Sequence, residues 1–311
     1  MKRILAFALI VTSLLSCKKG ENTAPETPSS GTLNVYTVDN DNVSILRQNL
    51  DGTAPKSLVA YQQDAGKNIF IGDVSANTPV TKIAYLLRKG EPGAYLTELH
   101  LAAADGSNDR VLKSYKQNNV YPLMVKIGNN GIIYYTYRDF NDDSYQLYSI
   151  NENGTGETKI SGVFRGISDI TADGKYVVAL SDLSNLLRLN YFDVTANGDV
   201  RNALYTDLSI SGLRQARISP DGKKLIALYL SYGIKCRIID LATKKYTDVS
   251  ITTGLAGDAY HYYMSLAPDN DKIIFMAQGS SSSTSYIYSQ TSGQITQFNN
   301  VTNGVAQGYI F

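Results

Sequence analysis

A stretch of eleven residues, apolar at both ends and with an aspartate at its fourth position, occurs three times in the chain. The copies are Ile170–Leu180, Ile218–Leu228 and Leu266–Met276, and their aspartates, Asp173, Asp221 and Asp269, follow one another at a spacing of 48 residues. Apolar runs on both sides of a short polar turn predict two antiparallel strands in each copy. A fixed period of this length indicates a chain built from repeated structural units.

The most regular unit contains four strand patterns. They are Leu213–Ile218, Lys224–Leu230, Ile234–Leu241 and Tyr246–Ile251. Turns at Pro220–Gly222, Ser231–Gly233 and Ala242–Thr243 separate them. Gly and Asp are hairpin signals in the first two turns, because they tolerate the positive φ that a tight turn requires. Helical periodicity is nearly absent from the rest of the chain, so the sequence predicts an all-β protein.

The same four-strand pattern can be followed along most of the chain. Five complete units are predicted, at 68–112, 121–160, 163–205, 213–251 and 261–298. A sixth unit at the start of the chain lacks its first strand and contains only Leu33–Val38, Val43–Leu50 and Lys56–Val59. The missing strand is supplied by Val305–Phe311, a single strand at the end of the chain. The sequence therefore predicts a six-bladed β-propeller over residues 32–311, with four-stranded blades and with N- and C-terminal strands sharing one blade.

The first residues predict an export signal and a lipid anchor. Met1–Arg3 is basic, and Ile4–Leu15 is apolar but too short to span a bilayer as a helix. Leu14–Cys17 resembles the lipobox of bacterial lipoproteins, which implies a signal peptide over residues 1–16 and lipidation of Cys17. Lys18 implies sorting to the outer membrane of a Gram-negative bacterium, with residues 17–31 as a flexible tether. The alternative is an ordinary secretory signal with a chance cysteine.

Composition limits the classes of partner. The formal net charge is +1, from 29 basic and 28 acidic residues, which argues against nucleic-acid binding. With Cys17 lipidated, Cys236 has no disulfide partner; it is expected to be a buried strand residue, the alternative being a thiol activated by Lys235 and Arg237. The 23 tyrosines fit sheet propensity, with a sugar- or peptide-binding surface as the alternative.

The turn sequences carry a family resemblance. Ile218–Leu225, Leu50–Thr53 and Ala104–Ser107 resemble the WD-like repeats of TolB-type six-bladed propellers. The resemblance covers nearly all of residues 33–311, and it implies a fold shared by periplasmic translocation proteins, peptidase-attached propellers and lipoproteins. The chain departs from the pattern at Asn77 and at Asn129–Gly131, and it lacks the amino-terminal α/β domain of the translocation protein.

No cofactor or metal is expected. The aspartates at the repeated turns are interpreted as turn residues rather than as a carboxylate ring. Asp139–Ser144 resembles the start of a calcium loop, but Ser144 and Ile150 stand where glycine and a carboxylate are needed, so at most a weak surface calcium site is predicted. Histidine occurs only at His100 and His261, which leaves little for a histidine metal site.

One aromatic segment is the candidate ligand site. Tyr260, His261, Tyr262 and Tyr263 enter the first strand of the last full unit, which a propeller places nearest its axis. Arg165, Arg214 and Arg217 enter equivalent strands of other units and are candidates for anion contacts. The alternative for the aromatic segment is packing between blades.

The sequence thus predicts a non-catalytic, monomeric binding or scaffold protein on the outer membrane, engaging a protein partner or an envelope glycan through the propeller rim or channel. The alternative is a carbohydrate- or peptide-processing enzyme with an active site in the axial channel. No Gly-x-Ser-x-Gly nucleophile motif or glycine-rich phosphate loop is found. A third hypothesis is an assembly subunit for nutrient uptake with a stable membrane partner.

Overall fold

The computed structural model describes the greater part of one compact unit, Leu33–Phe311. The described residues are 34–39, 43–49, 54–63, 68–77, 80–91, 94–116, 120–128, 130–139, 144–164, 166–171, 173–183, 186–193, 205–207, 210–252, 261–267, 269–278, 283–300 and 309–310. Cys17, with the predicted signal peptide and tether, lies outside them.

The described strands form six antiparallel sheets of four strands each, named here A to F. Sheet A contains β24 (Tyr309–Ile310), β1 (Asn34–Asp39), β2 (Ser44–Asn49) and β3 (Lys56–Ala60). Sheet B contains β4 (Asn68–Ala76), β5 (Lys82–Glu91), β6 (Ala94–Ala103) and β7 (Arg110–Lys116). Sheet C contains β8 (Val120–Ile127), β9 (Ile132–Asp139), β10 (Ser144–Asn151) and β11 (Thr158–Phe164).

The remaining three sheets follow the same order. Sheet D contains β12 (Gly166–Ile170), β13 (Tyr176–Leu183), β14 (Leu186–Asp193) and β15 (Tyr205–Asp207). Sheet E contains β16 (Leu213–Ile218), β17 (Lys224–Leu230), β18 (Ile234–Asp240) and β19 (Tyr246–Ser250). Sheet F contains β20 (His261–Leu266), β21 (Lys272–Gln278), β22 (Ser283–Ser289) and β23 (Ile295–Asn300).

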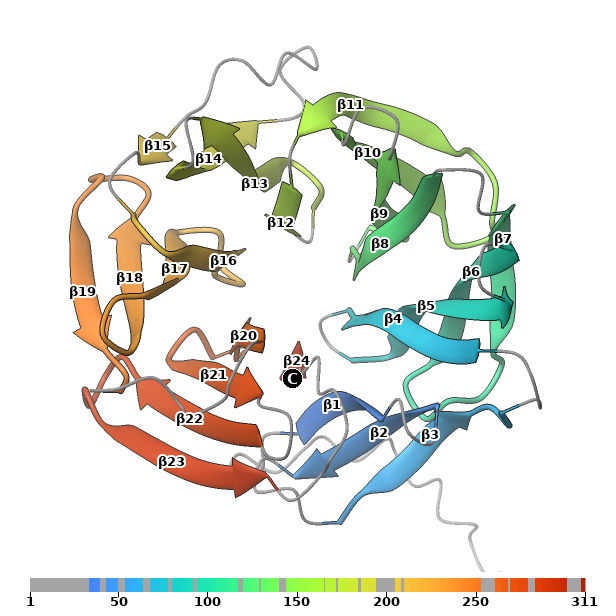
Figure 1. Ribbon diagram of the computed structural model, residues 1–311, viewed down its shortest axis with the longest axis horizontal. Helices are drawn as coiled ribbons and strands as arrows, with labels where there is room; N and C mark the ends of the chain where they lie inside the picture. The colour runs from blue at the N-terminus through green and yellow to red at the C-terminus, as the bar shows by residue number, and fades with distance from the viewer. Residues whose placement is uncertain are drawn as a thin grey trace, which may run out of the picture. The chain divides into compact units, whose positions relative to one another are not determined.

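The first strands of the sheets are the inner strands of a ring (Figure 1). β24 contacts β4, and the contacts continue from β4 to β8, β12, β16 and β20, which in turn contacts β24. Sheet A joins the two ends of the described unit, because β24 pairs with β1 through Val35–Ile310 and Tyr36–Tyr309. The predicted all-β propeller is therefore confirmed, and the sharing of one sheet by N- and C-terminal strands is observed directly.

The turns that follow the inner strands are closed by the same kind of hydrogen bond, from a backbone N–H to an aspartate side chain. Asp173 and Asp221 each accept a bond through Oδ1 from the backbone N–H two residues on, at 2.9 and 3.1 Å, and a glycine with positive φ follows each aspartate. Asp269 accepts a bond from Asp271 N at 2.9 Å, and Asn270 takes the positive φ of 57°. These contacts confirm that the repeated aspartates are turn residues, since a side-chain acceptor closes the turn on its own backbone.

Asparagine performs this task where the aspartate is missing. Asn77 Oδ1 accepts from Thr81 N at 3.0 Å and from Lys82 N at 2.8 Å, and Asn130 Oδ1 accepts from Ile132 N at 3.2 Å. The departures from the Pro-Asp-Gly turn in sheets B and C thus keep the side-chain acceptor and change only its identity.

Apolar side chains fill the seams between neighbouring sheets. Val74 and Ile83 pack with sheet A, whereas Leu86 and Leu99, on the other face of sheet B, pack with sheet C. Each side chain of this size contributes roughly 1.5–3 kcal/mol when it is fully buried. Both faces of a sheet are covered by neighbouring sheets. Successive residues of a strand point to opposite faces, so the strand carries apolar side chains toward both neighbours.

One expected boundary differs in the structure, and a second is only partly described. Val163 was expected to start the unit in sheet D, but it lies in β11, the outer strand of sheet C, and β12 begins at Gly166. The expected strand Val305–Phe311 is described only at Tyr309–Ile310, and residues 301–308 lie outside the described residues.

Gly106, in the turn between β6 and β7, gives a test of how closely sheets A and B approach. Its φ is +85°, and a Cβ added there would lie 1.9 Å from the carbonyl oxygen of Leu58 in β3. Gly222 has a similar φ of +69° with nothing within 4 Å of an added Cβ, so it is the matched control. We expect Gly222→Ala to cost about 1 kcal/mol for the φ alone, and Gly106→Ala about 2 kcal/mol more for the clash. Urea denaturation of both variants measures the difference, and equal losses would contradict the close approach.

Candidate functional site

The inner strands create a hydrogen-bonding problem that decides where polar residues lie. Each inner strand is the edge of its sheet, so it has one paired neighbour and one unpaired side. Buried backbone groups on such an edge need a partner, since an unpaired buried N–H is costly. Side chains of the preceding inner strand provide several of these partners.

Sheet B supplies two such bonds to sheet C. Asp73 Oδ2 accepts from Val125 N at 2.8 Å, and Ser75 Oγ accepts from Ile127 N at 3.2 Å. Asp73 is 5% exposed and Ser75 1%, so both bonds are formed away from bulk water.

The same pattern continues from sheet D through sheet E to sheet F. Asp169 Oδ2 accepts from Ile218 N at 2.9 Å, and Gln215 Oε1 accepts from Met264 N at 2.6 Å. Arg217 Nε donates to the Met264 carbonyl at 3.3 Å. We call these five side chains the inner-strand lace: Asp73, Ser75, Asp169, Gln215 and Arg217.

A small charged group lies within the lace, at Asp169. Its Oδ1 atom is 3.1 Å from Lys126 Nζ of sheet C and 3.6 Å from Arg217 Nη1 of sheet E. The Asp169 side chain is 3% exposed, Arg217 12% and Lys126 25%. Two cations from two sheets therefore approach one buried carboxylate.

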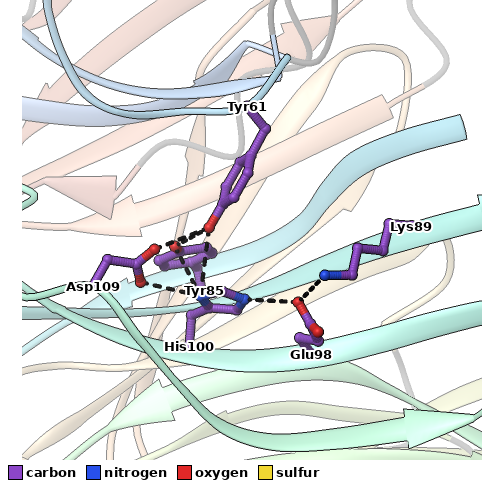
Figure 2. A network of polar contacts seen from close by, with 6 residues as sticks. All are labelled: Tyr61, Tyr85, Lys89, Glu98, His100 and Asp109. Atoms are coloured by element: carbon purple, nitrogen blue, oxygen red, sulfur yellow. Dashed lines mark hydrogen bonds and ion pairs between the residues drawn. The ribbon is translucent and has the colours of Figure 1, made fainter. Parts of the chain in front are cut away.

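A second polar cluster, the seam cluster, joins sheets A and B further from the inner strands. It consists of Tyr61, Tyr85, Glu98, His100 and Asp109, and Figure 2 shows these side chains converging on the His100 ring. Tyr85 lies opposite His100 across β5 and β6, and their rings stack at 4.7 Å between centroids. Tyr61 reaches in from the segment after β3.

The two histidine nitrogens of the seam cluster face acidic side chains. His100 Nδ1 is 3.1 Å from Asp109 Oδ1, and Nε2 is 3.2 Å from Glu98 Oε2. Glu98 also pairs with Lys89 Nζ at 2.8 Å, so its charge is held from both sides (Figure 2). Tyr61 donates to Asp109 Oδ2 at 3.0 Å and lies 2.6 Å, oxygen to oxygen, from Tyr85.

Burial sets the proton states of this cluster. Burial raises the pKa of Tyr85 far above its ordinary value, and burial likewise raises the pKa of Tyr61. Burial would also raise the pKa of Asp109, but hydrogen bonds from His100, Tyr85 and Tyr61 outweigh it and leave that pKa lowered. The phenols therefore stay neutral donors and Asp109 stays an ionised acceptor, an arrangement suited to holding two sheets together.

The next seam repeats the arrangement. Glu157, just before β11, accepts hydrogen bonds from Tyr115 of sheet B, at 3.1 Å, and from Tyr135 of sheet C. Tyr135 occupies the position in β9 that Tyr85 occupies in β5, because the two pair with Val125 and Val74 of their inner strands. A carboxylate before the outer strand thus ties tyrosines of two sheets at both seams. This repetition assigns the seam cluster to sheet–sheet attachment.

The predicted aromatic ligand segment is only partly described. Tyr260 lies outside the described residues, and His261 is the first residue of β20. Tyr262 packs with the apolar core between sheets E and F, so Tyr263, the next residue in the strand, faces the other way. The strand therefore does not gather the two described tyrosine side chains on one face, and their role in binding stays a prediction.

The three predicted arginines have different surroundings. Arg165 lies outside the described residues, Arg214 is exposed in β16, and Arg217 belongs to the inner-strand lace. Sequence reasoning missed Lys126, Asp73 and Asp169. The signal for the aspartates was an acidic residue in a first strand, shortly before the turn that follows that strand.

Cys236 is the buried strand residue that the sequence predicts. It is fully buried in β18, and burial raises the pKa of its thiol to about 12. The thiol is therefore protonated at neutral pH and is not activated by Lys235 and Arg237.

Two structural searches apply to the described part of the chain alone. Within it, no group of three or more His, Cys, Asp or Glu side chains is placed to hold a metal ion. Residues 140–143 of the suggested calcium loop and residues 40–42 lie outside that part. No described helix has the length and apolar character needed to cross a membrane.

Comparison with known proteins gives the fold. No family model matches the chain, and no curated protein matches it. Among solved structures, TolB from Acinetobacter baumannii is similar with a TM-score of 0.66 and 16% identity, over 90% of this chain and 66% of that one. A putative TolB from Agrobacterium tumefaciens has a TM-score of 0.51 and 10% identity, over 90% of this chain and 97% of that one.

An enzyme also shares the fold. An oligogalacturonate lyase in complex with manganese has a TM-score of 0.52 and 14% identity, over 83% of this chain and 71% of the lyase. The chain spans just under two thirds of the Acinetobacter protein. At these identities the likeness shows the β-propeller fold and no particular activity.

The lowered pKa of Asp109 gives a pH prediction for the seam cluster. Because this pKa is lower in the folded than in the unfolded chain, the stabilisation is present above about pH 4 and is lost as the pH falls through the folded value. Asp109→Asn should lower the free energy of unfolding by about 1–3 kcal/mol at pH 7. The difference from the unsubstituted protein should shrink toward pH 2. Urea denaturation across this range measures it, with Tyr61→Phe expected to show a smaller difference in the same direction. A difference independent of pH would rule out the ionised Asp109 as the acceptor.

Proposed function

We propose that this chain is a six-bladed, TolB-like propeller that binds a protein partner through the inner edges of its sheets and catalyses no reaction. The observation that carries the proposal is the charged group of Lys126, Asp169 and Arg217. Buried or half-buried charges are costly to place among apolar strands. Hydrogen bonding between inner strands needs only an acceptor, as Ser75 and Gln215 show, so Lys126, which is a quarter exposed beside Asp169, is explained best by a partner that its ammonium contacts.

The proposed location is the outer membrane of a Gram-negative bacterium. The supporting features are the apolar run Ile4–Leu15, the lipobox-like Leu14–Cys17 and the Lys18 that follows. Lipid on Cys17 would hold the propeller at the membrane through the tether 17–31, with the domain acting as a monomer. A single acyl chain gives only weak, reversible attachment, so stable anchoring through Cys17 would take more than one chain.

The seam cluster supports binding over catalysis. Its tyrosines have raised pKa values, so they are poor general bases near neutral pH. His100 is 4% exposed, and its two ring nitrogens already face Asp109 and Glu98. A general base needs an accessible atom within reach of the substrate, and His100 offers none.

The second candidate is a carbohydrate-processing enzyme. It is favoured by the fold shared with the oligogalacturonate lyase and by two buried carboxylates, Asp73 and Asp169, on inner strands. Each of these carboxylates, however, accepts a backbone N–H from the next sheet. A group committed to a structural bond is less free to act as an acid or base, so binding is the better-supported function.

Photo-crosslinking in intact cells tests the proposal. A photoreactive residue is placed at Lys223, in the exposed turn after inner strand β16, or at Thr243, in the exposed turn after β18 of the same sheet. We expect one discrete adduct from position 223 and none from position 243, because only the first lies beside an inner edge.

Cys17→Ser is the control for the anchor. This variant should leave the membrane fraction and lose the adduct at position 223. Equal adducts at both positions, or none at either, would contradict partner binding at the inner edges. Unchanged membrane fractionation of Cys17→Ser would overturn the lipid anchor.

A further inference from the structure

The proton state of His100 follows from its neighbours in the seam cluster. Nδ1 lies 3.1 Å from Asp109 Oδ1, and Nε2 lies 3.2 Å from Glu98 Oε2. A ring nitrogen that carries a proton donates a hydrogen bond, whereas a ring nitrogen without one presents a lone pair. Each nitrogen faces a carboxylate oxygen, so only the protonated form of that nitrogen makes a favourable contact there.

The two phenols of the cluster leave no proton for Nδ1 to accept. Tyr61 donates its one proton to Asp109 Oδ2 at 3.0 Å. The Tyr61 and Tyr85 oxygens are 2.6 Å apart, which requires a proton between them, and Tyr85 supplies it because Tyr61 has used its own. The Tyr85 oxygen, 3.1 Å from Nδ1, is therefore an acceptor toward the ring. Nδ1 has acceptors as its neighbours, so it carries a proton.

The charges of the cluster balance when both ring nitrogens are protonated. Glu98 Oε2 lies between His100 Nε2 and Lys89 Nζ, as Figure 2 shows. In the described part of the chain the cluster then holds two carboxylates, Asp109 and Glu98, and two cations, Lys89 and the His100 imidazolium. A neutral ring would leave one negative charge uncompensated where His100 is 4% exposed, and an uncompensated buried charge is costly.

We propose that the seam cluster is a pH-dependent latch in which the His100 imidazolium holds sheet A on sheet B. Loss of either ring proton turns a lone pair toward a carboxylate and releases the latch. Asp109 is the carboxylate that moves, because 28% of its side chain is exposed against 9% for Glu98. Its movement breaks the hydrogen bond from Tyr61 that joins the two sheets. Sheet A also contains the pairing of N- and C-terminal strands, so the latch acts on the sheet that closes the ring.

The direction of the pH effect follows from the groups around the ring. They are Tyr61 after β3, Tyr85 and Lys89 on β5, Glu98 on β6 and Asp109 directly before β7. The charged ring is the bound form, so its stabilisation is present while His100 is protonated and is lost as the pH rises through its deprotonation. Burial raises the pKa of both phenols, so they stay neutral during that step.

The test is an NMR titration of the full chain toward alkaline pH, with labels on the histidine ring nitrogens and on the valine and isoleucine methyl groups. The chain has two histidines, and His261→Gln leaves the His100 ring as the one signal. Val59 in β3 reports on the core between sheets A and B, and Ile239 in β18, which packs in a different core cluster, is the control. We expect both ring nitrogens to be protonated in the closed seam. The loss of a ring proton and the change of the Val59 signals should share one midpoint, with Ile239 unchanged.

Variants assign the midpoint to the charges of the cluster. Glu98→Gln should move it to lower pH by about one unit or more, because a neighbouring opposite charge favours the charged ring by that much. Lys89→Gln removes a cation and should move it to higher pH. Glu91→Gln, at the exposed end of β5, is the matched control and should leave it unchanged. Methyl spectra at neutral pH show whether each variant is folded, and Lys89→Gln keeps the test valid if Glu98→Gln unfolds.

Four results would overturn the inference. The first is a neutral His100 ring while the Val59 signals are those of the closed seam. The second is deprotonation of the ring at a pH where the Val59 signals do not change. The third is a simultaneous change of Val59 and Ile239, which would mean that the whole domain unfolds. The fourth is the same midpoint in Glu98→Gln as in Glu91→Gln, which would exclude the ion pair as the source of the effect.

Discussion

The unpaired side of each inner strand is the constraint on which the rest of this structure depends. A sheet that meets its neighbours around a ring exposes one strand edge toward the centre, and its backbone groups cannot all be left without partners. The chain meets this need by placing an acceptor side chain on one inner strand opposite an N–H of the next, as with Asp73 and Val125, or Asp169 and Ile218. The sheets are therefore joined at the inner edge by directed bonds as well as by apolar packing.

The seams have polar contacts at two radii with apolar packing between them. Near the inner strands the inner-strand lace fixes how one sheet is aligned with the next, because each hydrogen bond joins a particular side chain to a particular backbone amide. Further out, Asp109 and Glu157 tie tyrosines of adjoining sheets together. The apolar layer between them supplies most of the free energy, and it is not directional. Hydrogen bonds between particular partners lie on both sides of this apolar layer. They can select one alignment of the sheets, although the sheets are similar to one another.

Residues that attach the sheets to one another can be distinguished from residues that are available to a binding partner. Most lace residues make a bond that the fold needs, and the seam cluster is closed off by its own contacts. Lys126, which contacts the lace through Asp169, is different, because a quarter of its side chain is exposed and only Asp169 pairs with it in the described part of the chain. The binding role that we propose for the inner edge rests on this exposed ammonium, since the fold alone does not decide function.

The sequence predicts the repeats, the strands and the turns because each depends on residues close together in the chain. An Asp-Gly pair between two apolar runs, such as Asp221 and Gly222, predicts a turn. The lace joins residues such as Asp169 and Ile218, whose partnership depends on how two sheets are aligned, and no local pattern reveals that. A shift in strand register between Ile167 and Asp169 adds to the difficulty, because it changes which residues of β12 face sheet E.

The seam cluster shows the same limit. His100 is visible in the sequence as one of two histidines, but its neighbours Tyr61 and Asp109 come from different sheets. Conversely, Tyr262 and Tyr263 are adjacent in the sequence and were expected to act together, and strand alternation separates their side chains. Proximity along a strand does not place Tyr262 and Tyr263 on one face, while the observed cluster joins residues that the fold brings together.

Native-state hydrogen exchange of the Ile218 amide tests the lace most directly. In Asp169→Ala this amide loses its acceptor, whereas the Met264 amide, bonded to Gln215, keeps its own. The account predicts that Ile218 exchanges at least about tenfold faster relative to Met264 than in the unsubstituted protein, as expected for the loss of one buried hydrogen bond. An unchanged ratio of the two rates would show that the inner strands are not held by these side chains.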